Sequence, residues 1–272
     1  MRYESKKWLA RRGFMRILFV GDVFSIKGRE ILARQLKKMR QEKGVQFIVV
    51  NGENIAHGHG INEKYYHFLL EQNVNVVSLG NHAFRNHDIY NFIEGAKNLI
   101  RPLNFPAGVP GQGFLTVNYN GKKITVFQVM GRIYENTALD CPFQTTEQLL
   151  KNVKSDLYFC DFHGEATSEK AAFAHHFDGR VHIVVGTHTH VQTNDARILP
   201  KGTMFITDLG MTGSLDGIIG VTPQNIIKKF LTGLPARHDP MEEGRSQFNG
   251  LLVELDDQTQ KVTNFEVIHV IE

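Results

Sequence analysis

The sequence contains only two cysteines and no long apolar run, and each shortage excludes a class of protein. Two cysteines, Cys141 and Cys160, cannot form a disulfide framework, so we interpret them as ordinary core or loop residues and expect a cytoplasmic protein. The apolar runs fall short of the ~18 residues that a membrane-spanning helix needs, so we expect a soluble chain without membrane contacts. The composition, 42% apolar and 22% charged, excludes disordered and fibrous proteins.

The sequence motifs of several common enzyme classes are also missing. The chain has no Gly-x-x-x-x-Gly-Lys-Ser/Thr phosphate loop, no Gly-x-Gly-x-x-Gly after the first predicted strand, no Gly-x-Ser-x-Gly elbow and no His-Glu-x-x-His. These absences argue against the chemistries that depend on those motifs. The sequence also lacks internal repeats, low-complexity tracts and any linker that would separate independent domains.

Basic charge is scarce once the first 14 residues are set aside. Residues 1–14 hold five of the 31 basic side chains and one of the 28 acidic ones, which leaves 26 basic and 27 acidic side chains for the rest of the chain. We therefore predict no stable nucleic-acid binding, which requires basic charge over the folded surface. Residues 1–14 lack the apolar core of a secretory signal, and we interpret them as a flexible basic extension. A membrane-touching or partner-binding arm is the alternative.

Strand-like and helix-like segments alternate through the first two thirds of the chain. This rhythm is typical of a mainly parallel sheet covered by helices. Short apolar runs predict strands at residues 16–20, 47–50, 74–79, 157–160 and 181–185. Amphipathic spacing predicts helices at residues 28–43, 63–72, 88–99 and 168–176.

The middle and the end of the chain have a different character. Residues 115–119 and 123–130, joined by Asn120-Gly121, predict a hairpin with a type I′ turn. Further strands are predicted at 204–207, 251–255 and 261–270, and we expect a second, antiparallel group of strands beside the first sheet. Residues 209–248 form a long excursion with one short helix near 223–231, and we predict that it forms the rim of an active site.

Histidine is abundant, with 13 in 272 residues, and it is the commonest metal ligand. Polar side chains follow five of the predicted strands, and several of them are histidines. They are Asp22; Asn51, Glu53 and Asn54; Asn81 and His82; Asp161 and His163; and His188 and His190. Ligands of open α/β sheets bind at the carboxyl ends of the strands, where such residues converge.

This combination of side chains predicts a metal site. Harder divalent metals are coordinated by carboxylate, amide and imidazole groups, whereas the absence of a thiolate weakens a structural zinc site. Asn and Asp after strands are also frequent turn formers. Coincidence is a weak explanation for ligand types after five strands.

At these residues the chain resembles the calcineurin-like metallophosphoesterases. Their pattern is Asp, then Gly-Asp or Gly-Glu, then Gly-Asn-His, a later His and Gly-His-Thr-His. This chain departs from it in three places, because Phe24 stands where Asp-x-His has its histidine, Glu53 replaces the bridging Asp, and Ala83 follows Gly-Asn-His. The YmdB-type subgroup shares all three departures and is similar to the chain from Met15 almost to the C-terminus. The shared strings include residues 161–170 (DFHGEATSEK), 186–193 (GTHTHVQT) and 211–213 (MTG).

The resemblance implies an α/β fold, the four-layer α/β/β/α metallophosphoesterase sandwich, formed by a single domain over residues 15–272. It also implies a dinuclear metal site. Asp22, Glu53, Asn54 and His190 would hold one ion, and Glu53, Asn81, His163 and His188 would hold the other, with Glu53 bridging. The family is associated with iron, and manganese or magnesium are alternatives.

The activity implied by the resemblance is that of a phosphodiesterase for cyclic nucleotides, notably 2′,3′-cyclic ones. A metal-bound hydroxide would attack phosphorus while His82 protonates the departing ribose oxygen. His57 and His59, in the loop after Glu53, would line the substrate pocket, with solvated loop histidines as the alternative. The partner is then a small-molecule nucleotide, and a homo-oligomer stays open.

Two other functions remain open. The chain could be a metallophosphatase for another phosphoester, such as a nucleotide monoester or an RNA end. It could also be a regulatory or RNA-associated protein with a weakly active metal site, although a vestigial site has no physical reason to retain a complete ligand set.

Overall fold

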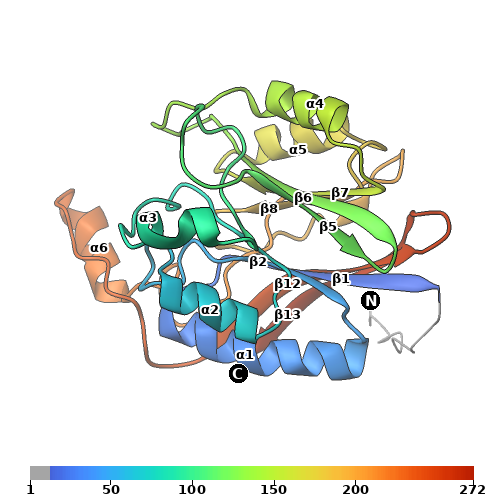
Figure 1. The fold of residues 1–272 in the computed structure, drawn as a ribbon. Coiled ribbons are helices and arrows are strands. Elements are labelled where there is room, and N and C mark those ends of the chain that lie inside the picture. The colour runs from blue at the N-terminus through green and yellow to red at the C-terminus, as the bar shows by residue number, and fades with distance from the viewer. Residues whose placement is uncertain (1–12) are drawn as a thin grey trace.

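The computed structural model describes residues 13–272 and places two β-sheets face to face, with helices on both outer faces (Figure 1). Separate apolar cores lie between the two sheets and between each sheet and its helices, which confirms the predicted four-layer sandwich. The extension predicted for residues 1–14 lies almost entirely outside the described residues. Within residues 13–272, no helix is both long and apolar enough to cross a membrane.

The first sheet has seven strands and is built around β1 (Phe14–Val20). Three parallel strands follow on one side of it: β2 (Phe47–Asn51), β3 (Val76–Ser78) and β4 (Leu99–Ile100). Antiparallel strands complete the sheet: β12 (Ser246–Asp256), which pairs with β1, and β13 (Val262–Ile271) and β11 (Gly213–Ser214), which pair with β12. The outer face packs against α1 (Ser25–Lys43), α2 (Glu63–Glu71) and α3 (Ile89–Phe92).

The second sheet has six strands in the order β5-β6-β7-β8-β10-β9. Its parallel centre consists of β6 (Lys122–Met130), β7 (Leu157–His163), β8 (Ile183–Thr187) and β10 (Met204–Ile206). Its antiparallel edges are β5 (Phe114–Tyr119) and β9 (Arg197–Ile198). The outer face packs against α4 (Pro142–Asn152) and α5 (Thr167–His176).

Strand β1 is buried on both faces, which explains why it is an apolar run rather than an alternating one. Leu18 and Val20 pack toward the helices, whereas Ile17 and Phe19 pack toward the second sheet. The ring of Phe19 meets the ring of Phe159 on β7 edge to face, with centroids 5.8 Å apart. The central strands of the two sheets are therefore in direct contact.

Three details of the sequence prediction need correction. The C-terminal strands do not form a separate antiparallel group, because β12 and β13 extend the first sheet, and the second sheet has a parallel centre. The helix predicted over 88–99 ends at Phe92 and is followed by a short 3₁₀ turn, because Leu99 enters the sheet as part of β4. Helix α4 was not predicted.

The hairpin turn is confirmed, with φ of 49° at Asn120 and 76° at Gly121.

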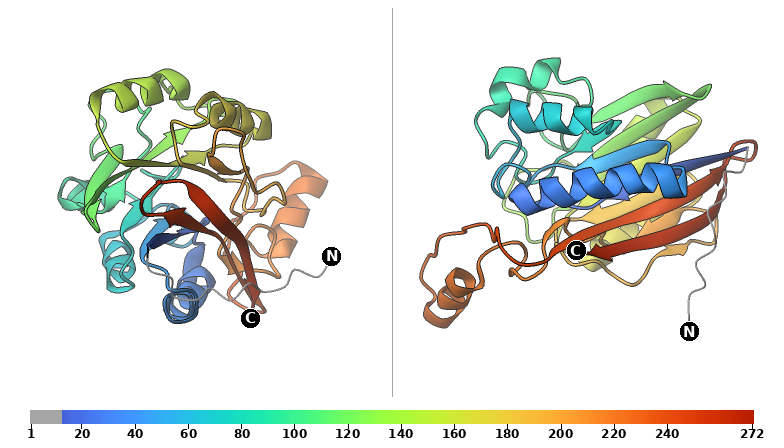
Figure 2. Two further views of the ribbon diagram at one scale, coloured as in Figure 1. Left: turned by 90° about the vertical axis from the view of Figure 1, so that its right-hand side faces the viewer. Right: turned by 90° about the horizontal axis from the view of Figure 1, so that it is seen from below.

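The excursion at residues 209–248 contains β11, α6 (Pro223–Thr232) and the start of β12. Helix α6 stands away from the sandwich at the end where β1 terminates, as Figure 1 and the right-hand view of Figure 2 show. It is anchored by Ile226, which packs with Phe24 and Met211 in a small apolar cluster. Phe230 and Leu231 on the same helix are exposed.

Candidate metal centre

The structure brings together all seven predicted metal ligands. The first sheet contributes Asp22 after β1, Glu53 and Asn54 after β2, and Asn81 after β3; the second contributes His163 at the end of β7 and His188 and His190 after β8. The two groups meet across the sandwich, since Asn81 Oδ1 lies 2.8 Å from His163 Nε2. The backbone N–H of His188 also donates to Asp22 Oδ2 at 3.2 Å.

One half of the centre surrounds His163 Nε2. Glu53 Oε1 lies 3.2 Å from this nitrogen, Asn81 Oδ1 lies 2.8 Å from it, and His188 Nδ1 lies 3.0 Å from it. Ligand atoms of Glu53, His163 and His188 all lie within 4.8 Å of one another. The oxygens of Glu53 and Asn81 can only accept hydrogen bonds. Their convergence on His163 Nε2 therefore calls for a proton or a cation between these atoms.

The far nitrogen of each histidine ligand faces an acceptor, which turns a lone pair toward the centre. Thr187 Oγ1 donates to Asp161 at 2.6 Å and therefore accepts from His163 Nδ1 at 2.8 Å. His190 Nδ1 lies 3.2 Å from the carbonyl oxygen of Ile219, and His188 Nε2 lies 3.4 Å from a Glu165 carboxylate oxygen. Acceptors behind histidine ligands fix the ring tautomer in metal sites.

The charges of the metal-free centre are balanced by a proton. Burial alone would lower the pKa of His163, but the carboxylates of Glu53, Asp22 and Asp161 together outweigh burial and raise that pKa to about 9. Burial alone would raise the pKa of Glu53, but His163 and His82 lower it to about 2. Burial, together with His163, lowers the pKa of His188 to about 3, which keeps this ring neutral. A metal cation at this place would replace the proton of His163.

The other half of the centre contains two buried oxygens without a partner. Asp22 Oδ1 and Asn54 Oδ1 accept no hydrogen bond from any of residues 13–272. His190 Nε2 lies 3.9 Å from Asp22 Oδ1, and burial raises the pKa of Asp22 to about 6. Because buried oxygens are almost always paired, these two orphaned oxygens, one of them beside the His190 imidazole, fit a cation site.

Gly80, just before Asn81, keeps open the space between the ligands. A Cβ atom at this position would lie 2.3 Å from Glu53 Oε2 and 2.5 Å from His163 Nε2. Both distances are far below van der Waals contact, and the obstructing atoms belong to buried ligands that cannot move aside. The glycine of the Gly-Asn-His motif is therefore required by the shape of the site.

His82 lies beside the ligands, with its side chain one-quarter exposed. Asn54 Nδ2 donates to Gly58 O at 3.0 Å and lies 2.9 Å from His82 Nδ1, so Nδ1 is the accepting nitrogen and Nε2 carries the hydrogen. Burial lowers the pKa of His82 below its usual value. Phe24, at the position of the missing histidine, packs its ring edge on against His190, with centroids 5.7 Å apart.

The two loop histidines have different surroundings. His59 lies beside His82, with ring centroids 5.3 Å apart. His57 and His59 are both exposed, and His57 has a positive φ of 54°. His238 of the excursion was not predicted and reaches the ring of His59, with centroids 6.5 Å apart. No sequence pattern around His238 predicts its approach to His59, because the excursion has no regular secondary structure there. Thr187 was also missed, although it lies within the Gly-Thr-His-Thr-His string.

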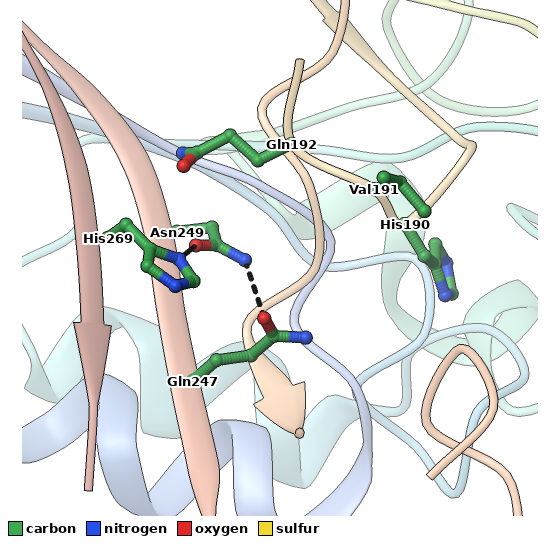
Figure 3. A pocket seen from close by; sticks show the side chains of 6 residues that line it. All are labelled: His190, Val191, Gln192, Gln247, Asn249 and His269. Atoms are coloured by element: carbon green, nitrogen blue, oxygen red, sulfur yellow. Dashed lines mark hydrogen bonds between the residues drawn. The ribbon is translucent and has the colours of Figure 1, made fainter. Parts of the chain in front are cut away.

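A cavity of about 370 Å³ opens beside His190 (Figure 3). One wall is formed by Gln247 and Asn249 of β12 and by His269 of β13. These side chains form a chain, because His269 Nδ1 lies 2.6 Å from Asn249 Oδ1, and Asn249 Nδ2 donates to Gln247 at 3.2 Å and to Met211 O at 2.8 Å. The cavity shares His190 with the metal centre and so borders it.

A two-sheet sandwich with such a ligand set at the shared edge defines a metallophosphoesterase-type protein. The sequence model of the YmdB-like protein family matches residues 18–268, so the chain belongs to the YmdB-like family. The chain is 45% identical over 256 residues to the 2′,3′-cyclic-nucleotide 2′-phosphodiesterase of Bacillus subtilis (strain 168), with 93% of this chain and 96% of that protein covered.

Two solved structures support the same assignment. A hypothetical protein from Thermus thermophilus is similar at 39% identity and a TM-score of 0.90, covering 95% of this chain and all of that one. A structure described as a novel phosphatase from Mycoplasma pneumoniae has 36% identity and a TM-score of 0.90, covering 95% and 94% of the two chains.

Proposed function

We propose that this chain is a dinuclear-metal phosphodiesterase that hydrolyses 2′,3′-cyclic nucleoside monophosphates. The observation that carries the proposal is the convergence of acceptor atoms from both sheets, with Asp22 Oδ1 and Asn54 Oδ1 left unpaired. The substrate class is supported by the 45% identical relative, which is a 2′,3′-cyclic-nucleotide 2′-phosphodiesterase. Hydrolysis of a phosphoester is also consistent with the phosphatase from Mycoplasma pneumoniae.

The ligands divide into two sets that share Glu53. Asp22, Asn54 and His190 would complete one ion site with Glu53, and Asn81, His163 and His188 would complete the other. Bound there, two ions would supply Lewis acidity and a water that ionises near neutral pH. Mixed oxygen and imidazole donors suit iron, which we propose as the metal, and they also accommodate manganese.

His82 would act on the leaving group. Because Asn54 faces Nδ1, Nε2 is the nitrogen left to reach the departing ribose oxygen, and it would pass a proton to that oxygen from the protonated ring. In a 2′,3′-cyclic substrate this oxygen remains attached to the ribose, so water adds across one P–O bond and the product is a nucleoside monophosphate. His59, whose ring lies next to that of His82, would contact the substrate, whereas His57 is the weaker candidate.

The proposal is tested by a substrate panel. Metal-loaded protein is assayed with 2′,3′-cyclic AMP, 3′,5′-cyclic AMP, bis(p-nitrophenyl) phosphate and 5′-AMP. We expect the highest kcat/KM on the 2′,3′-cyclic nucleotide. Turnover of the monoester alone would favour a phosphatase, and a metal-loaded protein without turnover on any of the four would favour a regulatory role.

A further inference from the structure

The loop that carries two of the candidate ligands has an unfavourable backbone conformation. His188 has a φ of 109° and His190 a φ of 63°, in the region that favours glycine. Such residues persist only where the surrounding structure holds them in place. The loop leaves β8 at Thr187 and passes next to the start of the excursion, where the N–H of Met211 donates to His190 O at 3.3 Å.

A fully buried ion pair lies against this loop. Lys170 of α5 and Asp208, after β10, are both 0% exposed, and Lys170 Nζ lies 2.8 Å from Asp208 Oδ2. Removing two charges from water is costly unless each makes further hydrogen bonds. Neither residue belongs to the predicted ligand set.

The remaining hydrogen bonds of the pair go to the backbone of the ligand loop. Lys170 Nζ donates to Thr187 O at 2.8 Å, and Asp208 Oδ2 accepts from the N–H of Thr189 at 3.1 Å. These two groups belong to the peptide units on either side of His188. Asp208 Oδ1 accepts from the N–H of Gly210 at 2.8 Å, which ties the excursion to the same point.

We propose that Lys170 and Asp208 are positioning residues that hold the strained His188–His190 loop in its metal-binding conformation before any metal arrives. Each charged group makes a hydrogen bond to one of the peptide units flanking His188. The loop therefore cannot relax to a lower-energy backbone conformation without breaking a charged hydrogen bond. The inference rests on the proposed metal centre. It concerns how the centre is built rather than which phosphoester is cleaved.

The test measures metal affinity and loop protection rather than activity. Lys170→Met alone leaves a buried, unpaired carboxylate and could unfold the protein, so the principal variant is Lys170→Met/Asp208→Asn, which removes both charges. We expect Mn²⁺ binding, measured by calorimetry, to weaken at least ~10-fold, the effect typical of lost outer-shell partners. In the metal-free protein, we expect the amide hydrogen of Thr189 to exchange faster than in wild type.

A second buried ion pair provides the control. Arg16 and Glu254, with side chains 5% and 9% exposed, pair at 3.0 Å on β1 and β12. Arg16→Met/Glu254→Gln should lower the unfolding midpoint without changing the Mn²⁺ affinity or the exchange of Thr189.

The proposal is overturned if the Lys170/Asp208 variant binds Mn²⁺ like wild type, or if the control variant weakens binding equally. If wild type binds metal but cleaves no phosphodiester, the proposed function fails while the affinity ratio still decides this inference. A wild-type chain that binds no metal would overturn both.

Discussion

The histidine ligands are held by neighbours that can only receive a hydrogen bond from them. The carbonyl of Ile219, the carboxylate of Glu165 and the hydroxyl of Thr187, whose own hydrogen goes to Asp161, each face the nitrogen that points away from the centre. His188 and His190 therefore present a lone pair inward without rearrangement, and His163 does so once the proton that it shares with Glu53 leaves. This arrangement is the one that the proposed metal centre would need.

Gly80→Ala should abolish metal binding without unfolding the protein. The new methyl group would lie between Glu53 and His163, at 2.3 and 2.5 Å from their ligand atoms, and neither side chain has room to retreat. Metal content by elemental analysis checks this. Gly95→Ala is the control, because no described atom lies within 4 Å of a Cβ built there. A Gly80→Ala protein with the wild-type metal content would contradict the geometry.

His82→Ala should keep its metals and lose most turnover. Removal of a general acid or base typically costs ~10²–10⁴-fold in rate, and His82 is not in either ligand set. Burial lowers its pKa below the usual value, so the ring is already neutral at pH 7. Because only the protonated ring can act as the acid, the rate at saturating substrate should fall as pH rises through neutrality. Loss of metal from this variant would make His82 a ligand and refute its proposed role.

At the scale of elements, a histidine outside the candidate site makes a hydrogen bond to the second sheet. His182 precedes β8, and its Nδ1 accepts from the backbone N–H of Tyr158 in β7 at 3.2 Å. Burial lowers the pKa of His182 to about 4. Because this pKa is depressed in the folded state, its contribution to stability is complete above pH ~6.5 and is lost as pH falls toward 4.

His182→Asn should reduce the loss of stability in acid. Between pH 6.5 and 5 the wild-type chain should lose about 2 kcal/mol of unfolding free energy through this group. Asparagine offers an acceptor to Tyr158 but does not titrate. Denaturant unfolding of both proteins at pH 7 and pH 5, with chelator present to exclude metal effects, measures the difference. Equal acid losses in the two proteins would show that His182 is not responsible.

The sequence predicted most elements whose pattern is local. The buried runs became β1, β2 and β7, and the positive φ values of Asn120 and Gly121 produced the predicted hairpin turn. The placement of β12 beside β1 was not predictable, because pairing between strands more than 200 residues apart leaves no local pattern. The long helix predicted at 88–99 failed because tertiary pairing of Leu99 overrode its helical spacing.

In the candidate site, too, residues with a local sequence pattern could be predicted, whereas residues defined by distant contacts could not. Its ligand types could be predicted because each stands directly after an apolar run, where strand ends converge. Thr187, Lys170 and Asp208 could not be assigned roles, since what defines them is a hydrogen bond to a distant segment. His238 reaches the site only through the path of the irregular excursion.

At the scale of the whole molecule, bound metals would link the two sheets. Asp22, Glu53, Asn54 and Asn81 follow strands of the first sheet, whereas His163, His188 and His190 belong to the second. A ligand that binds only the folded state stabilises it by ~4 kcal/mol at 1,000 times its Kd. We therefore expect the melting temperature to rise by several degrees with metal and to fall on addition of chelator. His163→Ala should lose most of this rise; an unchanged rise would place the metal elsewhere.

The most direct test of the central claim is the number of metal ions bound by the metal-free chain, measured by calorimetric titration with Mn²⁺. Two ions per chain are predicted for the wild type. Glu53→Gln should weaken both sites, because the Glu53 carboxylate is the ligand that the two sets share. A single ion per chain, or a Glu53→Gln protein that still binds two ions with wild-type affinity, would contradict a dinuclear centre bridged by Glu53.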